Sequence, residues 1–118
     1  MTENRKEVSL EFLLQVTENN KEEIKSFIED VLSLKKDTLP LMNNALLNKD
    51  FITLKEGAHK LKSAIKIFGL GSLQGSLEEV ETSASENDFT QVKELMVNVN
   101  NLFPLWEKEL DDAYNSLQ

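Results

Sequence analysis

The sequence predicts an all-α protein, an up-down-up-down antiparallel four-helix bundle with a short accessory helix at its N-terminal end. Apolar residues recur at intervals of three and four along most of the chain, which places them on one face of successive helices. The connections between these segments are short, so neighbouring helices are expected to run antiparallel. No stretch carries the signal of a strand. The chain has 118 residues, and this length predicts one domain.

The first segments of the chain predict a tail and the accessory helix. Residues 1–8 are expected to form a flexible tail before a bundle domain at 9–118. A short helix is expected near 9–16, because Val8, Phe12 and Val16 are four residues apart and can cover one end of the bundle.

A long helix is expected next, from Asn20 to about Asn48. Asn20 is a suitable N-cap, and Glu23 three residues later resembles a capping box. The apolar stripe of this helix consists of Ile24, Phe27, Val31, Leu34, Thr38, Met42 and Ala45.

The third helix is predicted over 51–68, with Asp50 as its N-cap and Gly69 at its C-terminal end. Its buried stripe is expected to be Leu54, Ala58, Leu61, Ile65 and Phe68.

Two further helices complete the prediction. The fourth is expected over 70–85, where Gly71 and Gly75 lower the helix propensity but allow a close approach to the third helix. Its stripe is Leu70, Leu73, Leu77, Val80 and Ala84. The fifth follows Asp88 as N-cap and runs to about Tyr114. Its stripe, with a largely buried tryptophan, is Val92, Met96, Val99, Phe103, Trp106, Leu110 and Ala113.

A basic stripe surrounds the single histidine of the chain. Lys55, His59, Lys62 and Lys66 are spaced by four, three and four, so they share a face of the third helix that differs from its apolar face. The formal net charge of the chain is −8, so a cluster of lysines on one helix is a candidate anion site. Neutral imidazole is also a nucleophile near neutral pH. The helix pattern alone nevertheless favours a solvated histidine among solvated lysines.

Composition excludes several other classes of function. A chain with one histidine and no cysteine disfavours a zinc site. The acidic charge disfavours binding to nucleic acid. No apolar run approaches the length of a membrane span, and the N-terminus lacks the apolar region of a signal peptide. We therefore expect a cytoplasmic monomer that does not interact with membranes.

The linear motif around the histidine reads Ala58-His59-Lys60-Leu61-Lys62-Ser63, followed by Gly69, Leu73 and Leu77-Glu78. This motif resembles the histidine-containing phosphotransfer (HPt) domain of bacterial two-component phosphorelays. The family has the pattern Ala-His-x-Leu-Lys-Gly, with a glycine ten residues after the histidine and a later Leu-Glu pair. One position departs from this pattern, since Ser63 stands where the family usually has glycine.

The resemblance implies a phosphoryl carrier. His59 is expected to accept a phosphoryl group through Nε2 from the aspartate of a receiver domain and to pass it to the aspartate of another receiver. Lys62 lies one turn further along and is expected to stabilise the phosphoryl oxygens. The sequence contains no phosphate loop or glycine-rich nucleotide strand, so autokinase activity is not expected. The chain is expected to need no cofactor of its own, because the receiver supplies Mg²⁺.

The expected partners are receiver domains of response regulators or of a hybrid sensor histidine kinase. Residues expected at the partner contact are Lys55, Ser63, Lys66, Ile67, Gln74 and Glu78. Two alternatives stay open. One alternative to the phosphorelay carrier is a non-catalytic adaptor bundle with an inert histidine, and the other is the excised HPt module of a hybrid sensor histidine kinase.

Overall fold

The computed structural model describes residues 7–117, and this part of the chain forms α-helices and one 3-10 turn, without a strand. The all-α fold class is therefore confirmed. The elements are α1 (Glu11–Val16), α2 (Lys21–Leu47), α3 (Phe51–Ile65), the 3-10 turn η1 (Lys66–Phe68), α4 (Ser72–Ser85) and α5 (Phe89–Asn115). None of the described helices is both long enough and apolar enough to cross a membrane.

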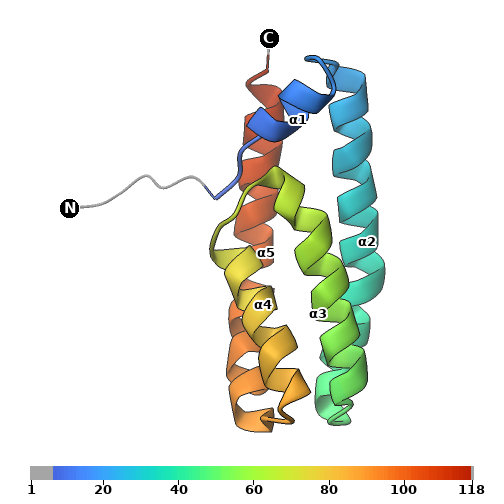
Figure 1. Ribbon diagram of the computed structural model, residues 1–118, viewed down its shortest axis with the longest axis vertical. Helices are drawn as coiled ribbons and strands as arrows, with labels where there is room; N and C mark the ends of the chain where they lie inside the picture. Colours follow the sequence, from blue (N-terminus) through green and yellow to red (C-terminus); the bar gives the residue numbers. More distant parts are fainter. Residues whose placement is uncertain (1–6, 118) are drawn as a thin grey trace, which may run out of the picture.

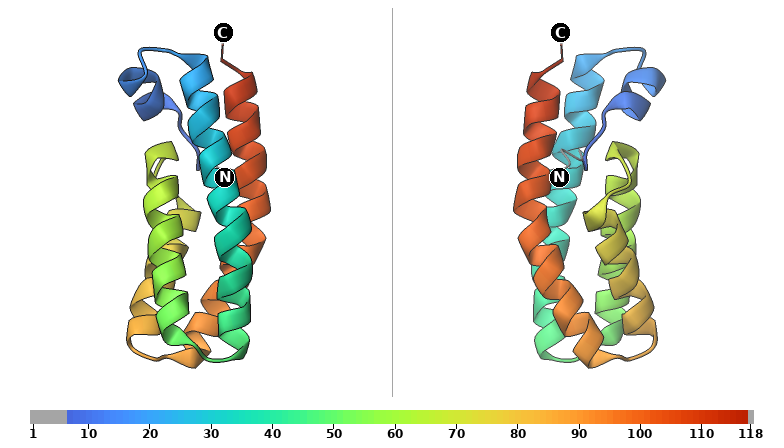
Figure 2. Two further views of the ribbon diagram at one scale, coloured as in Figure 1. Left: turned by 90° about the vertical axis from the view of Figure 1, so that its right-hand side faces the viewer. Right: turned by 90° about the vertical axis from the view of Figure 1, so that its left-hand side faces the viewer.

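The four longer helices lie side by side and reverse direction at each connection (Figure 1). α3 packs against α2 and α4, and α5 packs against α4 and, less extensively, against α2. The side views in Figure 2 show the pair α3 and α4 next to the pair α2 and α5. α1 crosses the end of the bundle at which the chain enters α2, where it contacts η1 and α2.

Short polar side chains begin three of the helices, as predicted. Asn20, Asp50 and Asp88 each accept a hydrogen bond from the backbone N–H three residues later, and each distance is 3.1 Å. The tight turns after α2 and α4 contain Lys49 and Asn87 in the left-handed conformation, with φ of 53° and 56°. These caps and turns fix where the antiparallel helices begin, and so they fix which side chains face each other.

The predicted apolar stripes form most of the core. Every predicted core residue of the third helix is fully buried, and so are most of those of the fifth helix. Trp106 is 4% exposed and makes edge-to-face contacts with Phe68 and Phe103, at centroid distances of 5.8 and 6.0 Å. The burial of Trp106 is therefore confirmed.

Two predicted core positions of the longer helices are wrong. Leu70 is 72% exposed, because α4 begins only at Ser72 and Leu70 lies in the connection before it. Phe27 is 39% exposed. It lies in the first turns of α2, which extend beyond the end of α3, so this neighbour does not cover it (Figure 1).

The accessory helix also buries a different set of residues from the one predicted. Phe12 and Val16 are 53% and 55% exposed, whereas Leu10 and Leu13 are buried. The predicted stripe requires a helix that already includes Val8, but α1 begins at Glu11. Val8 is buried before the helix starts.

The polypeptide packs against the bundle earlier than the predicted boundary at residue 8. The Glu7 carboxylate accepts a hydrogen bond from the backbone N–H of Ser72, at the start of α4. The backbone N–H of Val8 donates to Glu109 Oε2 at 2.8 Å. Residues 1–6 of the predicted tail lie outside the described residues. The described part of the tail is thus fixed to α4 and α5.

A different glycine from those predicted provides the close approach between helices. A Cβ at Gly57 would lie 2.5 Å from Met42 Cγ, so Gly57 lets α3 approach α2. A Cβ at Gly75 would have no neighbour within 4 Å. Gly71 is next to the Glu7 side chain and not next to α3. The prediction that Gly71 and Gly75 bring α4 close to α3 is therefore wrong.

Candidate functional site

The single histidine lies in the middle of α3, on its solvent-facing side. Its neighbours in sequence, Ala58 and Leu61, are buried and hold the helix against the bundle. The His59 side chain is 61% exposed, so a partner protein can reach it. The antiparallel packing of α3 and α4 determines what lies beside the ring.

One carboxylate from α4 binds both His59 and Lys62. Glu81 Oε2 lies 3.1 Å from His59 Nδ1, and Glu81 Oε1 accepts a hydrogen bond from Lys62 Nζ at 2.8 Å. An ionised carboxylate only accepts hydrogen bonds, so His59 Nδ1 must carry the proton in this contact. In the neutral ring, the lone pair therefore resides on Nε2, the nitrogen that Glu81 does not contact. The geometry prepares Nε2 as a nucleophile.

The charges of Lys62 and Glu81 stabilise each other. The hydrogen bond from Lys62, followed by its positive charge, lowers the pKa of Glu81 although burial opposes the shift, and the contact with His59 adds to the lowering. The hydrogen bond to Glu81 likewise raises the pKa of Lys62, and the charges of Glu81 and Glu78 add to this effect. Both groups are therefore charged at neutral pH. Their side chains are each 21% exposed.

A hollow of about 300 Å³ opens beside the ring and contains one of the predicted partner residues. Its lining consists of Lys55, Glu56, His59, Lys60 and Glu81. Lys55 and Lys60 bring two ammonium groups to this hollow, and Glu56 and Glu81 bring two carboxylates. The lining therefore carries both signs of charge, whereas the lysine spacing alone predicted a positive surface.

The remaining predicted residues lie at different distances from this centre. Ser63 is exposed one turn after His59, and Glu78 is exposed on α4 close enough to influence the pKa of Lys62. Gln74 is half-buried near the start of α4, and the described residues show no hydrogen bond between it and His59.

Lys66 and Ile67 are in η1, beyond the end of α3. They line a separate hollow of about 400 Å³ together with Phe12, Gly69 and Leu70. The structure thus places Lys55, His59 and Lys62 together and puts Lys66 and Ile67 at a second, separate place.

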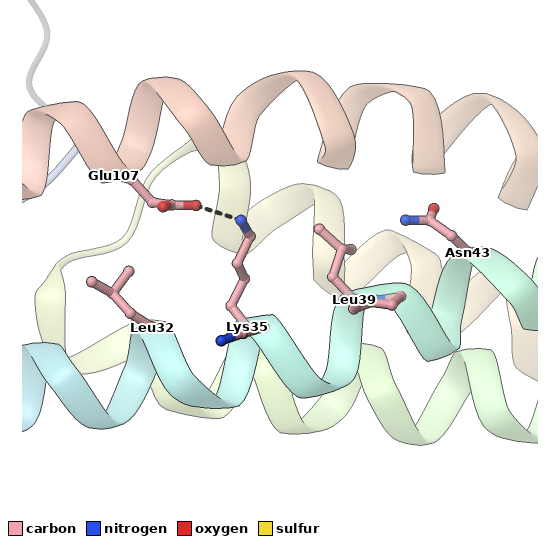
Figure 3. Close-up of a pocket in the computed structure, with 7 residues that line it drawn as sticks. Leu32, Lys35, Leu39, Asn43 and Glu107 are labelled. Carbon is pink, nitrogen blue, oxygen red and sulfur yellow. Dashed lines mark ion pairs between the residues drawn. The ribbon is translucent and has the colours of Figure 1, made fainter.

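A further hollow, of about 410 Å³, lies between α2 and α5 and contains none of the predicted site residues (Figure 3). Leu32, Leu39 and Asn43 line it from α2. Lys35 extends from α2 and forms an ion pair with Glu107 of α5 at 2.8 Å (Figure 3). This ion pair links the two helices whose packing against each other is less extensive, and we assign it a structural role.

Glu81 contacts His59 and Lys62 but was not among the site residues predicted from the sequence. It shares a polar face of α4 with Gln74 and Glu78, two of the residues predicted at the partner contact. The contact between Glu81 and His59 spans 22 residues and depends on the register of α3 against α4. The turn between these helices and the start of α4 set this register. The sequence therefore shows the polar face of α4, but it does not show which side chain of that face contacts the imidazole of His59.

The described residues contain no group of three or more histidine, cysteine, aspartate or glutamate side chains that could hold a metal ion. A family model described as the Hpt domain matches residues 22–117 of the chain. No curated protein and no solved structure matches the chain.

Proposed function

Because the chain belongs to the Hpt domain family, we propose that it is a phosphorelay intermediate that accepts a phosphoryl group on His59 from a receiver aspartate. It then passes the group to the aspartate of another receiver. Hpt domains are phosphotransfer carriers and not kinases. Membership of the family supports phosphotransfer in general, whereas the roles of individual residues and the direction of transfer are our proposal.

The observation that carries the proposal is the contact of Glu81 with His59 Nδ1 at 3.1 Å. With the proton held on Nδ1, the lone pair of Nε2 attacks the phosphorus of the receiver acyl phosphate. The N–P bond forms, the P–O bond breaks, and its electron pair leaves with the receiver carboxylate. The phosphorylated ring keeps the Nδ1 proton and is cationic, and the Glu81 carboxylate lies beside this charge.

The return step uses the same groups. A carboxylate oxygen of the second receiver attacks the phosphorus, the N–P bond breaks, and its electron pair returns to Nε2. The leaving group is then a neutral imidazole, so no proton has to move at His59. Lys62, one turn away, supplies positive charge to the phosphoryl oxygens. The receiver is expected to hold the Mg²⁺, which stabilises charge on the transferred group.

The partner surface in this proposal combines the two places described above. Lys55 lies beside the ring, Ser63 leaves room one turn away, and Glu78 lies across on α4. Lys66, Ile67 and Gln74 are proposed as outer contacts. The antiparallel course of α2 to α5 in Figure 1 supports the up-down-up-down bundle as the scaffold. The monomeric state and the cytoplasmic location stay predictions.

A pulse and chase tests the relay. The protein is first labelled by a receiver that carries radioactive phosphate, is separated from that receiver, and is then mixed with a second, unlabelled receiver. We expect label on the protein that is acid-labile and base-stable, and its transfer to the second receiver. Label that stays on the protein until it hydrolyses, with any receiver tested, would contradict the role of an intermediate.

A further inference from the structure

We infer that Lys62 exchanges partners during the relay, from the Glu81 carboxylate in the unphosphorylated protein to the phosphoryl group on His59 in the phosphorylated protein. Glu81 therefore limits how strongly Lys62 holds the phosphoryl group, and so it regulates how readily the protein passes that group on. This inference rests on the proposed function of His59.

The position of Lys62 makes the exchange possible without movement of the backbone. Lys62 Nζ and His59 Nδ1 bind the two oxygens of one carboxylate, at 2.8 and 3.1 Å, so the ammonium group already lies near the ring. Lysine has a flexible four-carbon side chain and three donors on a point charge. A rotation of this side chain can redirect the ammonium group from one side of the imidazole toward Nε2.

Two negative groups, the Glu81 carboxylate and the phosphoryl group, compete for the ammonium group of Lys62. A phosphorylated side chain carries a charge of about −1.5 to −2 near neutral pH. Glu81 already places a carboxylate at the site, and its lowered pKa keeps it ionised. Lys62 is the lysine that the structure pairs with this carboxylate, whereas Lys55 and Lys60 form no ion pair within residues 7–117. Lys62 must weaken one charge-assisted hydrogen bond before it can complete another.

The partial burial of the pair strengthens this competition. Both side chains are 21% exposed, so the ion pair is screened less than a fully exposed pair would be. If Lys62 were free in solvent, its hold on the phosphoryl group would not depend on Glu81. Because it is paired, removal of the Glu81 charge should leave Lys62 more available to the phosphoryl group.

A double-mutant cycle measures this coupling apart from any direct effect of Glu81 on the ring. The equilibrium constant for phosphoryl transfer from one receiver is compared among wild type, Lys62→Ala, Glu81→Gln and the double variant. Glu81→Gln keeps an acceptor for His59 Nδ1–H and removes the charge. Lys62→Ala should lower this equilibrium constant in both backgrounds. We expect the factor by which it falls to be about fivefold larger in the Glu81→Gln background than in the wild type. An equal or smaller loss in that background would overturn the inference.

A matched control and a spectroscopic measurement complete the test. Glu79→Gln makes the same change of charge at an exposed position of α4, and it should leave the effect of Lys62→Ala as it is in the wild type. Phosphoramidate, a small phosphodonor, phosphorylates the histidine without a receiver, and the ¹⁵Nζ resonance of Lys62 should then shift. An unchanged Lys62 resonance after phosphorylation contradicts the exchange. A wild-type protein that takes phosphate from phosphoramidate but from no receiver contradicts the proposed function instead.

Discussion

At the scale of single residues, one carboxylate contacts the two side chains to which we assign different roles in the proposed relay. Glu81 fixes the proton on His59 Nδ1 and holds Lys62 beside the ring. In the proposed relay, the first contact leaves Nε2 as the reactive nitrogen, and the second keeps a positive charge near the ring. The proposal assigns Lys62 a role that depends on its charge, and substitution of Lys62 tests this.

Lys62→Ala should slow phosphoryl transfer or shorten retention by roughly five- to thirtyfold without abolishing transfer, since one charge-assisted contact is lost. Lys62→Arg should recover part of the loss, because the charge returns with a different geometry. The time course of transfer from one phosphorylated receiver to the three proteins measures both effects, and circular dichroism checks that the helices are intact. If Lys62→Ala matches wild type at low and at high salt, Lys62 has no role in transfer.

The Lys62–Glu81 pair also predicts how stability depends on pH. The pKa of Glu81 is lowered from an ordinary value of 4.5. The stability that Glu81 contributes to the folded protein is therefore fully present above pH 4.5 and is lost as the pH falls through the folded-state pKa. The pKa of Lys62 is raised from 10.5, so its contribution is present below that pH and is lost as the pH rises through the folded-state pKa. Between these limits the contribution of the pair is constant.

The melting temperatures of wild type and Glu81→Gln, measured against pH, test this dependence. The wild type should have the higher Tm near about pH 8, where Lys62 and Glu81 are both charged, and the difference should shrink below about pH 4.5. Glu79→Gln serves as the control for a change of net charge. A difference that persists undiminished at about pH 3 would show that the ion pair is not its source.

At the scale of elements, local signals predicted the starts of α2, α3 and α5 but not the start of α4. Asn20, Asp50 and Asp88 cap the helices they were predicted to cap, because an N-cap needs only the residues next to it. Leu70 fits the apolar spacing of α4 but lies outside the helix, since α4 begins at Ser72. The start of α4 depends on Glu7, which binds Ser72 across 65 residues, and a local pattern cannot contain that contact.

The two helical glycines should respond in opposite ways to alanine. At Gly75 there is open space, so Gly75→Ala should raise the free energy of unfolding by about 0.5–1 kcal/mol through helix propensity. At Gly57 the new methyl group would collide with the buried Met42 side chain. The free-energy cost of this overpacking should exceed the stabilisation that alanine gains from its higher helix propensity. We expect a net loss of about 1 kcal/mol for Gly57→Ala.

Denaturant unfolding of the two variants and the wild type measures the difference. The comparison is controlled internally, because both variants make the same chemical change in a helix. A Gly57→Ala protein more stable than Gly75→Ala would mean that α2 and α3 do not approach each other as closely as the structure shows.

At the scale of the whole molecule, the segment before α1 forms hydrogen bonds with η1, with the start of α4 and with α5. Val8 N–H binds Glu109 of α5, Ser9 N–H binds the Phe68 carbonyl at 2.7 Å, and the Glu7 carboxylate binds the start of α4. Gly69 has φ of 115°, and a Cβ there would lie 3.1 Å from the Glu7 carbonyl oxygen. The segment therefore holds the end of α3 and the beginning of α4 in place.

Glu7→Ala should lower the free energy of unfolding by about 1 kcal/mol, because the N-terminus of α4 loses its only side-chain acceptor among the described residues. Glu94→Ala makes the same change at an exposed position of α5 and should have little effect. Equal stability of Glu7→Ala and the wild type in urea would contradict a capping role for Glu7.

The sequence was sufficient for the overall class and for the Hpt family, but not for the contacts between distant segments. Helical periodicity depends on neighbours three and four residues apart, so it predicted an all-α chain. The motif around His59 predicted the family, and the roles it implies for His59 and Lys62 stay predictions. Glu81 and Glu7 act across 22 and 65 residues, and only the packed bundle brings them to their partners.

The most direct test of the proposed relay is to locate the phosphoryl group on His59. Protein labelled with ¹⁵N-histidine is phosphorylated by a receiver, and ³¹P–¹⁵N coupling identifies the bonded nitrogen. Since His59 is the only histidine, the His59→Gln protein is the control and should fold but take no label. We predict a single N–P bond, at Nε2, with the proton on Nδ1. A bond at Nδ1, or label that His59→Gln accepts as well as the wild type does, would contradict the proposed role of His59.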